Sequence, residues 1–197
     1  MERKLKPILV NQMLREKGIR LFSPDEFRQI FRTTLRGTQE FIKDHTDDLF
    51  LKLRNGLYAL RSELPSELEI ANRLYQPSYI SFEYALAYFG ILPETVYTMT
   101  SATTRITREF LVQGKSYEYS RIKQTAYRGY QLIQIKNVKV LMAFPEKALI
   151  DYLYFVDLKF ISLNERLRTE KLSLKKALSY SRLFKRQSLI RLAREVL

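Results

Sequence analysis

Few side chains in this 197-residue sequence have the types and spacing that catalysis needs. It contains one histidine, His45, and no cysteine. One histidine without cysteine cannot supply a typical zinc site, and no thiolate nucleophile is available. His45 stands in the run Lys-Asp-His-Thr-Asp-Asp at the expected end of a helix, where a capping or solvated role is favoured over catalysis. We therefore expect a binding protein rather than an enzyme, with no metal and no cofactor.

Two further patterns could bind phosphate or magnesium. Residues 114–116 read Gly-Lys-Ser, like the end of a P-loop, but the motif needs a glycine five positions earlier, where Glu109 stands. The pairs Asp47-Asp48 and Glu67-Leu68-Glu69 are possible magnesium ligands, although neither pair has a third carboxylate in pattern. A magnesium-dependent enzyme that acts on nucleic acid through these carboxylates is therefore one alternative hypothesis.

The charge of the chain indicates a polyanionic partner. The net charge is +13 and the pI is about 9.9, and nucleic acid is the usual partner of such a protein. Residues 159–197 contain eleven Lys and Arg against three Glu. We expect basic side chains of this tail to contact DNA or a protein partner, and the candidates are Lys171, Lys175, Lys176, Arg182, Lys185 and Arg186.

The first sixty residues predict three helices. The first covers about residues 5–17, places Ile8, Leu9, Met13 and Leu14 near one face, and ends at Gly18, which suits a left-handed C-terminal position. The second begins with Ser23 as its N-cap and Pro24 at its first position. The third covers about residues 33–45, although Gly37 in its interior costs about 1 kcal/mol relative to Ala and its start could instead lie near Thr38.

A hairpin follows these helices and completes the order of a winged helix-turn-helix domain. Residues 49–53 have a period of two, with Leu49, Leu51 and Leu53 on one side and Phe50 and Lys52 on the other. Asn55-Gly56 is the pair that two-residue hairpins prefer. In such a domain the third helix lies in the major groove and the hairpin is the wing. We expect DNA contacts from Arg32, Thr34, Arg36, Gln39 and Lys43 around the third helix, and from Lys52, Arg54 and Asn55 in the wing. The spacing 32, 36, 39, 43 predicts one helical face.

The remainder of the chain predicts helices around a small sheet. Pro65 and Ser66 open a helix that Pro77 stops, and Ser81 can cap the helix that ends at Gly90. Strands are expected at residues 95–100, 116–122, 129–135 and 138–144, followed by a helix from about Pro145 to residue 156 and by basic helical segments.

Tyrosines are frequent in this second region, and three roles are open for them. Half-buried packing in strands is favoured over a stacking platform for single-stranded nucleic acid, and a protein interface is the third possibility. The tyrosines concerned are Tyr79, Tyr84, Tyr88, Tyr97, Tyr117, Tyr119, Tyr127 and Tyr130. We expect residues 76–105 to be scaffold, with neither Tyr79 nor Ser81 in an active site.

Four segments of the chain resemble the AbiEi antitoxins of bacterial type IV AbiE toxin-antitoxin systems. They are residues 55–60 (NGLYAL), 69–91 (EIANRLYQPSYISFEYALAYFGI), 96–105 (VYTMTSATTR) and 143–154 (AFPEKALIDYLY). The resemblance implies an N-terminal winged-helix domain that represses its own operon by binding promoter DNA, joined to a C-terminal antitoxin domain. It also implies a cognate nucleotidyltransferase-like toxin of the AbiEii type, which the antitoxin counters with or without direct contact.

Together these patterns predict an α+β protein with two domains, at residues 1–62 and 63–197, and a helical basic tail. The leading functional hypothesis is a repressor and antitoxin that is cytoplasmic and has no membrane partner, since no run approaches about 18 apolar residues. The alternative is a stand-alone winged-helix transcriptional regulator without a toxin.

Overall fold

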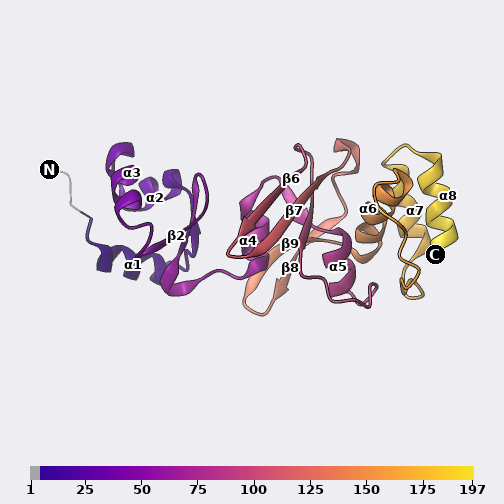
Figure 1. Cartoon of the computed structure of the whole chain (residues 1–197), viewed down its shortest axis with the longest axis horizontal. Helices are drawn as coiled ribbons and strands as arrows, with labels where there is room; N and C mark the ends of the chain where they lie inside the picture. Colours follow the sequence, from indigo (N-terminus) through magenta and orange to yellow (C-terminus); the bar gives the residue numbers. More distant parts are fainter. Residues whose placement is uncertain (1–4) are drawn as a thin grey trace. The chain divides into compact units, whose positions relative to one another are not determined.

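The computed structural model describes residues 5–197, which form two compact units that meet in the sequence between Leu74 and Tyr75 (Figure 1). This part of the chain contains eight α-helices and two β-sheets. The predicted α+β class is therefore confirmed. The division falls after Leu74, whereas the sequence placed a boundary after residue 62.

The first unit surrounds one aromatic core. Its elements are α1 (Pro7–Glu16), β1 (Leu21–Phe22), α2 (Pro24–Phe31), α3 (Leu35–Asp44), β2 (Phe50–Arg54), β3 (Leu57–Leu60), a short 3-10 helix (Arg61–Glu63) and α4 (Glu67–Leu74). The three strands form an antiparallel sheet in the order β1-β3-β2. Helices α1, α2 and α3 and this sheet enclose a cluster that includes Val10, Leu14, Phe22, Phe27, Ile42, Phe50 and Leu60.

Local signals set several ends of these elements as predicted. The Ser23 hydroxyl accepts a hydrogen bond from the Glu26 N–H at 3.2 Å, and the Glu26 carboxylate accepts one from the Ser23 N–H at 2.7 Å. This reciprocal pair satisfies two N–H groups that a helix start leaves without partners. Gly18 follows α1 with φ +63°, and Arg54 pairs with Leu57 around the Asn55-Gly56 turn.

Helix α1 buries a different face from the one predicted. Leu14 is buried as expected, but its partner in the core is Val10, one turn earlier on the same face. Ile8 is 81% exposed, Leu9 is 56% exposed and Met13 is 38% exposed. The helix therefore carries an apolar face that its own unit leaves uncovered.

Two ion pairs and one hydrogen bond connect helix α4 to residues that lie earlier in the first unit. Arg73 pairs with Glu26 at 2.6 Å, and Arg20 pairs with Glu69 at 3.4 Å. Arg54 donates from Nε to the carbonyl of Leu74 at 2.6 Å. These contacts explain why the first unit extends twelve residues beyond the hairpin-based boundary, from 62 to 74.

The second unit contains a six-stranded mixed sheet and the remaining helices. Its elements are β4 (Ser78–Ile80), α5 (Phe82–Tyr88), β5 (Met99–Thr103), β6 (Arg108–Val112), β7 (Lys115–Arg121), a 3-10 helix (Gln124–Ala126), β8 (Tyr130–Ile135), β9 (Val138–Ala143), α6 (Pro145–Asp157), α7 (Leu174–Arg182) and α8 (Gln187–Val196). The strand order is β6-β7-β5-β4-β9-β8, with parallel pairs β5-β7 and β4-β9. Helices α6, α7 and α8 pack together at one end of the unit (Figure 1).

In the second unit, three predicted strands coincide with β7, β8 and β9, and two strands were missed. The strand expected at 95–100 begins at Met99 and runs to Thr103. The first missed strand, β4, has three residues, all buried between β5 and β9, so it shows no alternation of apolar and polar side chains. The second missed strand, β6, pairs only with β7 at the edge of the sheet.

Candidate nucleic-acid interface

The third helix begins where the hydroxyl of Thr34 can cap it. Thr34 Oγ1 accepts a hydrogen bond from the Gly37 N–H at 3.1 Å, and α3 runs from Leu35. A Cβ on Gly37 would lie 3.0 Å from Thr33 Oγ1 and 3.2 Å from Thr34 Oγ1. The glycine that weakened the predicted helix therefore makes room for two threonine hydroxyls at its first turn.

The prediction that Arg32 shares a helical face with the other candidates is wrong. Arg32 is the C-terminal cap of α2 in the left-handed conformation, with φ 50° and ψ 45°, and so it precedes α3. Its side chain is exposed and lines a hollow beside α1. The left-handed turn that ends α2 interrupts the helical spacing on which the prediction depended.

Three predicted contacts do form one exposed stripe on α3. Arg36, Gln39 and Lys43 are exposed, while Thr38 and Ile42 on the other side are buried. Arg36 pairs with Glu40 at 2.8 Å, one turn along the same surface. The stripe therefore offers an amide and two cations, with one of the cations held by an acidic neighbour.

A shallow hollow of about 350 Å³ brings residues of the stripe next to the hairpin. Gln39 and Lys43 line it from α3, and Lys52 lines it from β2, opposite Tyr58 of β3. Pro24, Ile42 and Thr46 complete its lining. Two predicted surfaces, the third helix and the hairpin, thus meet around a glutamine amide and two ammonium groups.

The other two hairpin candidates differ from each other. Asn55 is exposed at the turn. Arg54 is half-buried, and its guanidinium donates to the carbonyls of Leu74 and Asn55, both at 2.6 Å. Arg54 therefore joins the hairpin to the end of α4, and much of its donor capacity is used within the unit.

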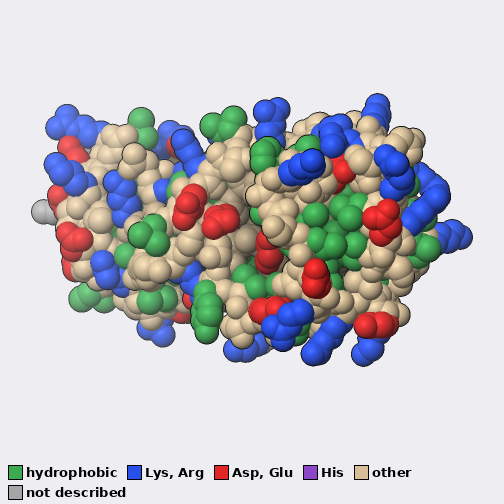
Figure 2. Space-filling view, turned by 45° about the vertical axis from the view of Figure 1, so that its right-hand side comes forward, with side chains coloured by type: hydrophobic (Ala, Val, Ile, Leu, Met, Phe, Trp, Pro, Cys, Tyr) green, Lys and Arg blue, Asp and Glu red, His purple; other side chains and the backbone are tan. Residues whose placement is uncertain are grey.

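The basic tail was predicted to be helical, and it contains α7 and α8, with Lys171, Lys185 and Arg186 in the segments beside them. Lys171, Lys175, Arg182 and Lys185 are exposed, and Figure 2 shows Lys and Arg side chains near this end of the second unit with acidic ones among them. The other two candidates have partners: Lys176 lies 3.8 Å from Glu146, and half-buried Arg186 lies 2.5 Å from Asp157. Five of the six candidates are thus exposed, Lys176 among them, and only Arg186 is half-buried.

Most of the tyrosines pack inside the second unit. Tyr79, Tyr117 and Tyr119 are at most 2% exposed, and Tyr130 stacks on Tyr79 with ring centroids 4.5 Å apart. The rings of Tyr79, Tyr117 and Tyr119 are too buried to stack on bases, so the structure gives these three a packing role. Tyr88 and Tyr97 are the most exposed of the set, at 47% and 78%, while Tyr84, Tyr127 and Tyr130 are half-buried.

A buried polar network in the second unit was missed by sequence reasoning. Asp151 Oδ2 accepts hydrogen bonds from the Tyr79 hydroxyl at 2.9 Å and the Ser81 hydroxyl at 2.8 Å, and Asp151 Oδ1 pairs with Lys147 Nζ. All four side chains are fully buried. The sequence feature that could have revealed it is a Lys and an Asp four positions apart in the otherwise apolar stretch 147–156.

The predicted capping role of Ser81 is therefore wrong. Ser81 occupies the N-cap position of α5, but its hydroxyl makes no hydrogen bond to that helix. It donates instead to the Asp151 carboxylate, because an ionised acceptor in a low-dielectric interior outcompetes a backbone group.

Burial governs the ionisation of this network. It raises the pKa of the Asp151 carboxyl and lowers the pKa of the Lys147 amine, and in each case the opposite charge of the partner opposes the effect. Burial and the nearby Asp151 charge also raise the pKa of Tyr79 well above its usual value, so its hydroxyl stays a donor. The network joins β4 and α6, which are distant in the sequence, and its role is to stabilise their packing.

The carboxylates named for magnesium do not form a metal site. Across residues 5–197, no group of three or more His, Asp or Glu side chains is placed to hold a metal ion. His45 Nδ1 lies 2.9 Å from Asp48 Oδ2, and its ring lies 4.6 Å from that of Phe41. This hydrogen bond with His45 is the main cause that lowers the pKa of the Asp48 carboxyl.

The described part of the chain has no helix of the length and apolar character needed to cross a membrane. A comparison with models of known protein families gives no match, and a search of curated proteins gives none either.

Proposed function

We propose that this protein is an antitoxin of the AbiEi type, which represses its own operon through the first unit and counters a nucleotidyltransferase-like toxin through the second. The proposal rests on the four segments that resemble the family, which together run from residue 55 to residue 154. The element order supports it, because helices α1 to α3 followed by the β2–β3 hairpin follow the order expected of a winged helix-turn-helix domain.

The observation that carries the DNA-binding role is the convergence of Gln39, Lys43 and Lys52 around one hollow. In the proposed complex α3 lies in the major groove, where a glutamine amide can pair with the edge of an adenine. The two lysines then contact phosphates on either side and set the register of the protein on the duplex. Asn55 reaches the backbone from the tip of the wing.

The antitoxin role is supported by where the resembling segments lie. Residues 69–91 provide Tyr79 and Ser81, and residues 143–154 provide Lys147 and Asp151. These four side chains form the buried network of the second unit. The most distinctive parts of the resemblance therefore hold one scaffold together, as expected if the chain shares the C-terminal domain of the family.

DNA binding is tested by fluorescence anisotropy with the upstream DNA of the operon and a shuffled duplex over a range of salt concentrations. We expect log affinity to fall linearly with log salt, by about 0.9 per phosphate neutralised. Gln39→Ala should reduce the preference for upstream DNA by about 1–3 kcal/mol. Lys43→Ala should weaken binding to both duplexes and reduce the slope of log affinity against log salt by about 0.9, the equivalent of one phosphate contact.

The matched control is Lys139→Ala, which removes an exposed lysine from β9 in the second unit. It should leave the sequence preference unchanged. Equal affinity of the unaltered chain for the two duplexes would contradict the repressor role.

The antitoxin role is tested by inducing the adjacent reading frame with and without this protein. Growth arrest that is relieved by the full chain, and also by residues 75–197 alone, is the expected result. Unimpeded growth in both cultures would withdraw the antitoxin role and favour a stand-alone regulator.

A further inference from the structure

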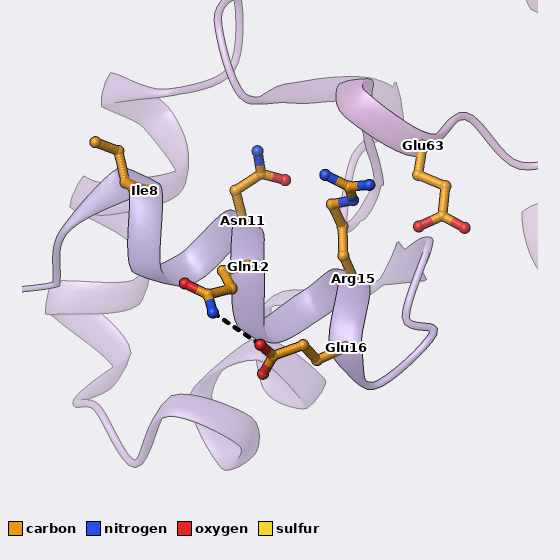
Figure 3. Close-up of a pocket in the computed structure, with 6 residues that line it drawn as sticks. All are labelled: Ile8, Asn11, Gln12, Arg15, Glu16 and Glu63. Carbon is orange, nitrogen blue, oxygen red and sulfur yellow. Dashed lines mark hydrogen bonds between the residues drawn. The ribbon is translucent and has the colours of Figure 1, made fainter.

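The apolar face that α1 leaves uncovered is built like an interface. Leu9 and Met13 line a hollow of about 660 Å³ beside Ile30 and Phe31 of α2. Ile8 extends this surface on the other flank, where Figure 3 shows it apart from the polar side chains of Arg15 and Glu63. An apolar helix face with a hollow beside it is typical of a surface that another protein covers.

The charges at the two ends of this face have the wrong sign for an isolated helix. Lys6 stands at the N-terminal end of α1 and Glu16 is its last residue. A helix favours acidic groups at its N-terminus and basic groups at its C-terminus. Both residues line the same hollow as Leu9 and Met13, and neither has an ion-pair partner within residues 5–197.

We propose that a second copy of this chain covers the face, with the two α1 helices antiparallel about a two-fold axis. Positions 6 and 16 are centred on position 11, and so are positions 9 and 13. The symmetry axis therefore places Lys6 opposite the second copy's Glu16, and Leu9 opposite its Met13. Each pair forms twice, as an isologous interface requires.

The antiparallel arrangement also relieves the unfavourable charge placement. Lys6 of one copy lies at the C-terminal end of the other copy's helix, where a cation is favoured, and Glu16 lies at the other N-terminal end. The contact involves one helix and its flanks, which is less than the roughly 800 Å² per partner of a standard interface. We therefore expect a dissociation constant of about micromolar order. This inference does not depend on DNA binding or on a toxin.

The first test is analytical ultracentrifugation of the full chain, without nucleic acid, from about 1 to 100 μM, the range that brackets a micromolar constant. We expect a monomer-dimer equilibrium. Leu9→Gln with Met13→Gln should raise the dissociation constant at least tenfold, whereas the control Leu111→Gln, at a side chain that is 74% exposed on β6, should leave it unchanged. A monomer at every concentration, or a dimer that the double variant does not weaken, would overturn the proposal.

The second test uses the two charges and can identify the geometry. Glu16→Lys places two lysines opposite each other at both ends, and Lys6→Glu places two glutamates there, so each variant alone should dimerise more weakly. Mixed together, the two variants should restore dimers, because every opposed pair again combines Lys with Glu. Mixtures that associate no better than either variant alone would rule out the antiparallel arrangement.

Discussion

Asp151 shows how one buried carboxylate can connect distant parts of a chain. One of its oxygens accepts hydrogen bonds from the hydroxyl groups of Tyr79 and Ser81, and the other pairs with the ammonium of Lys147. A buried charge is tolerated only when it is paired and hydrogen-bonded. Because all three donors find their acceptor on Asp151, the network specifies how β4 and α6 are placed relative to each other.

Removing one charge of this network should cost more than removing both. Lys147→Met leaves the Asp151 carboxylate without its cation, and we expect a loss of about 3–5 kcal/mol in the free energy of unfolding. Lys147→Met with Asp151→Asn should recover at least half of that loss, because the amide oxygen can still accept from Tyr79 and Ser81. Urea unfolding followed by circular dichroism measures both variants.

The control for this comparison is Lys139→Met, at an exposed lysine in the same unit, which should change stability by less than about 0.5 kcal/mol. If the double variant were no more stable than Lys147→Met alone, the two charges would not be coupled and the network would not act as a unit.

Glu26 should make the stability of the first unit depend on pH. Burial raises its pKa, but hydrogen bonds from Arg73 and Ser23 outweigh this and leave the pKa below its usual value. A lowered pKa in the folded state favours the ionised form, so its contribution is present above about pH 4.3, the ordinary pKa. It is lost as pH falls through the folded-state pKa.

Glu26→Gln tests this effect while it keeps a residue that can complete the capping box. At pH 7 the variant should be less stable by about 0.5 kcal/mol, the size of a partly exposed ion pair, and the difference should vanish near pH 2.5, well below the ordinary carboxyl pKa. Asp47→Asn, which removes an exposed carboxylate, is the control for the loss of one negative charge. A difference that is constant with pH would mean that the charge of Glu26 has no role.

At the scale of elements, the start of α3 explains why a glycine stands inside a helix. Gly37 lies against the hydroxyls of Thr33 and Thr34, and the latter caps the helix. An alanine there would gain about 1 kcal/mol in helix propensity. Its Cβ would also force the two hydroxyls to shift by a few tenths of an ångström, which weakens a cap that contributes about 1 kcal/mol.

A double-mutant cycle separates these two effects. Gly37→Ala should be neutral or destabilising in the natural sequence, and stabilising when Thr33→Ala and Thr34→Ala are already present. We expect a coupling of at least about 0.5 kcal/mol, above the limit for independent sites. Thermal unfolding of the four variants measures it, and a coupling near zero would contradict the packing described for Gly37.

The elements that the sequence predicts correctly are those whose ends carry a local signal, such as a capping residue, a proline or a turn pair. Ser23-Pro24 starts α2, Asn55-Gly56 turns the hairpin, and Pro145 begins α6, and each of these signals lies within a few residues of the boundary that it sets. Strand β4 has no such signal because its three residues become a strand only between β5 and β9.

The candidate interface was predictable to a similar extent. Exposure of Arg36, Gln39 and Lys43 follows from the helical period of α3. The placement of Arg32 does not, because a left-handed residue between two helices breaks that period. Nor could the sequence reveal that Arg54 bonds to Leu74, which lies twenty positions away and depends on the tertiary fold.

For the whole molecule, the position of the division after Leu74 has a measurable consequence. A fragment of residues 1–74 keeps the ion pairs of α4 with Arg20 and Glu26 and the hydrogen bond from Arg54, whereas a fragment of residues 1–62 loses them. We expect the longer fragment to unfold cooperatively and to be about 1–3 kcal/mol more stable, since each such contact contributes about 0.5–1 kcal/mol. Chemical unfolding of both fragments checks this, and equal stabilities would show that α4 contributes nothing to the first unit.

The parallel pairing of β4 with β9 bears on how the protein emerges from the ribosome. Every residue of the first unit has been made once Leu74 is added, but β4 must wait for Met142, the residue opposite Ile80. Such long-range pairings form late, because the loop between them must close first. A growing chain should therefore carry a finished N-terminal unit while the second is still open. If the proposed functions hold, the part that occupies the operator is ready before the part that counters the toxin.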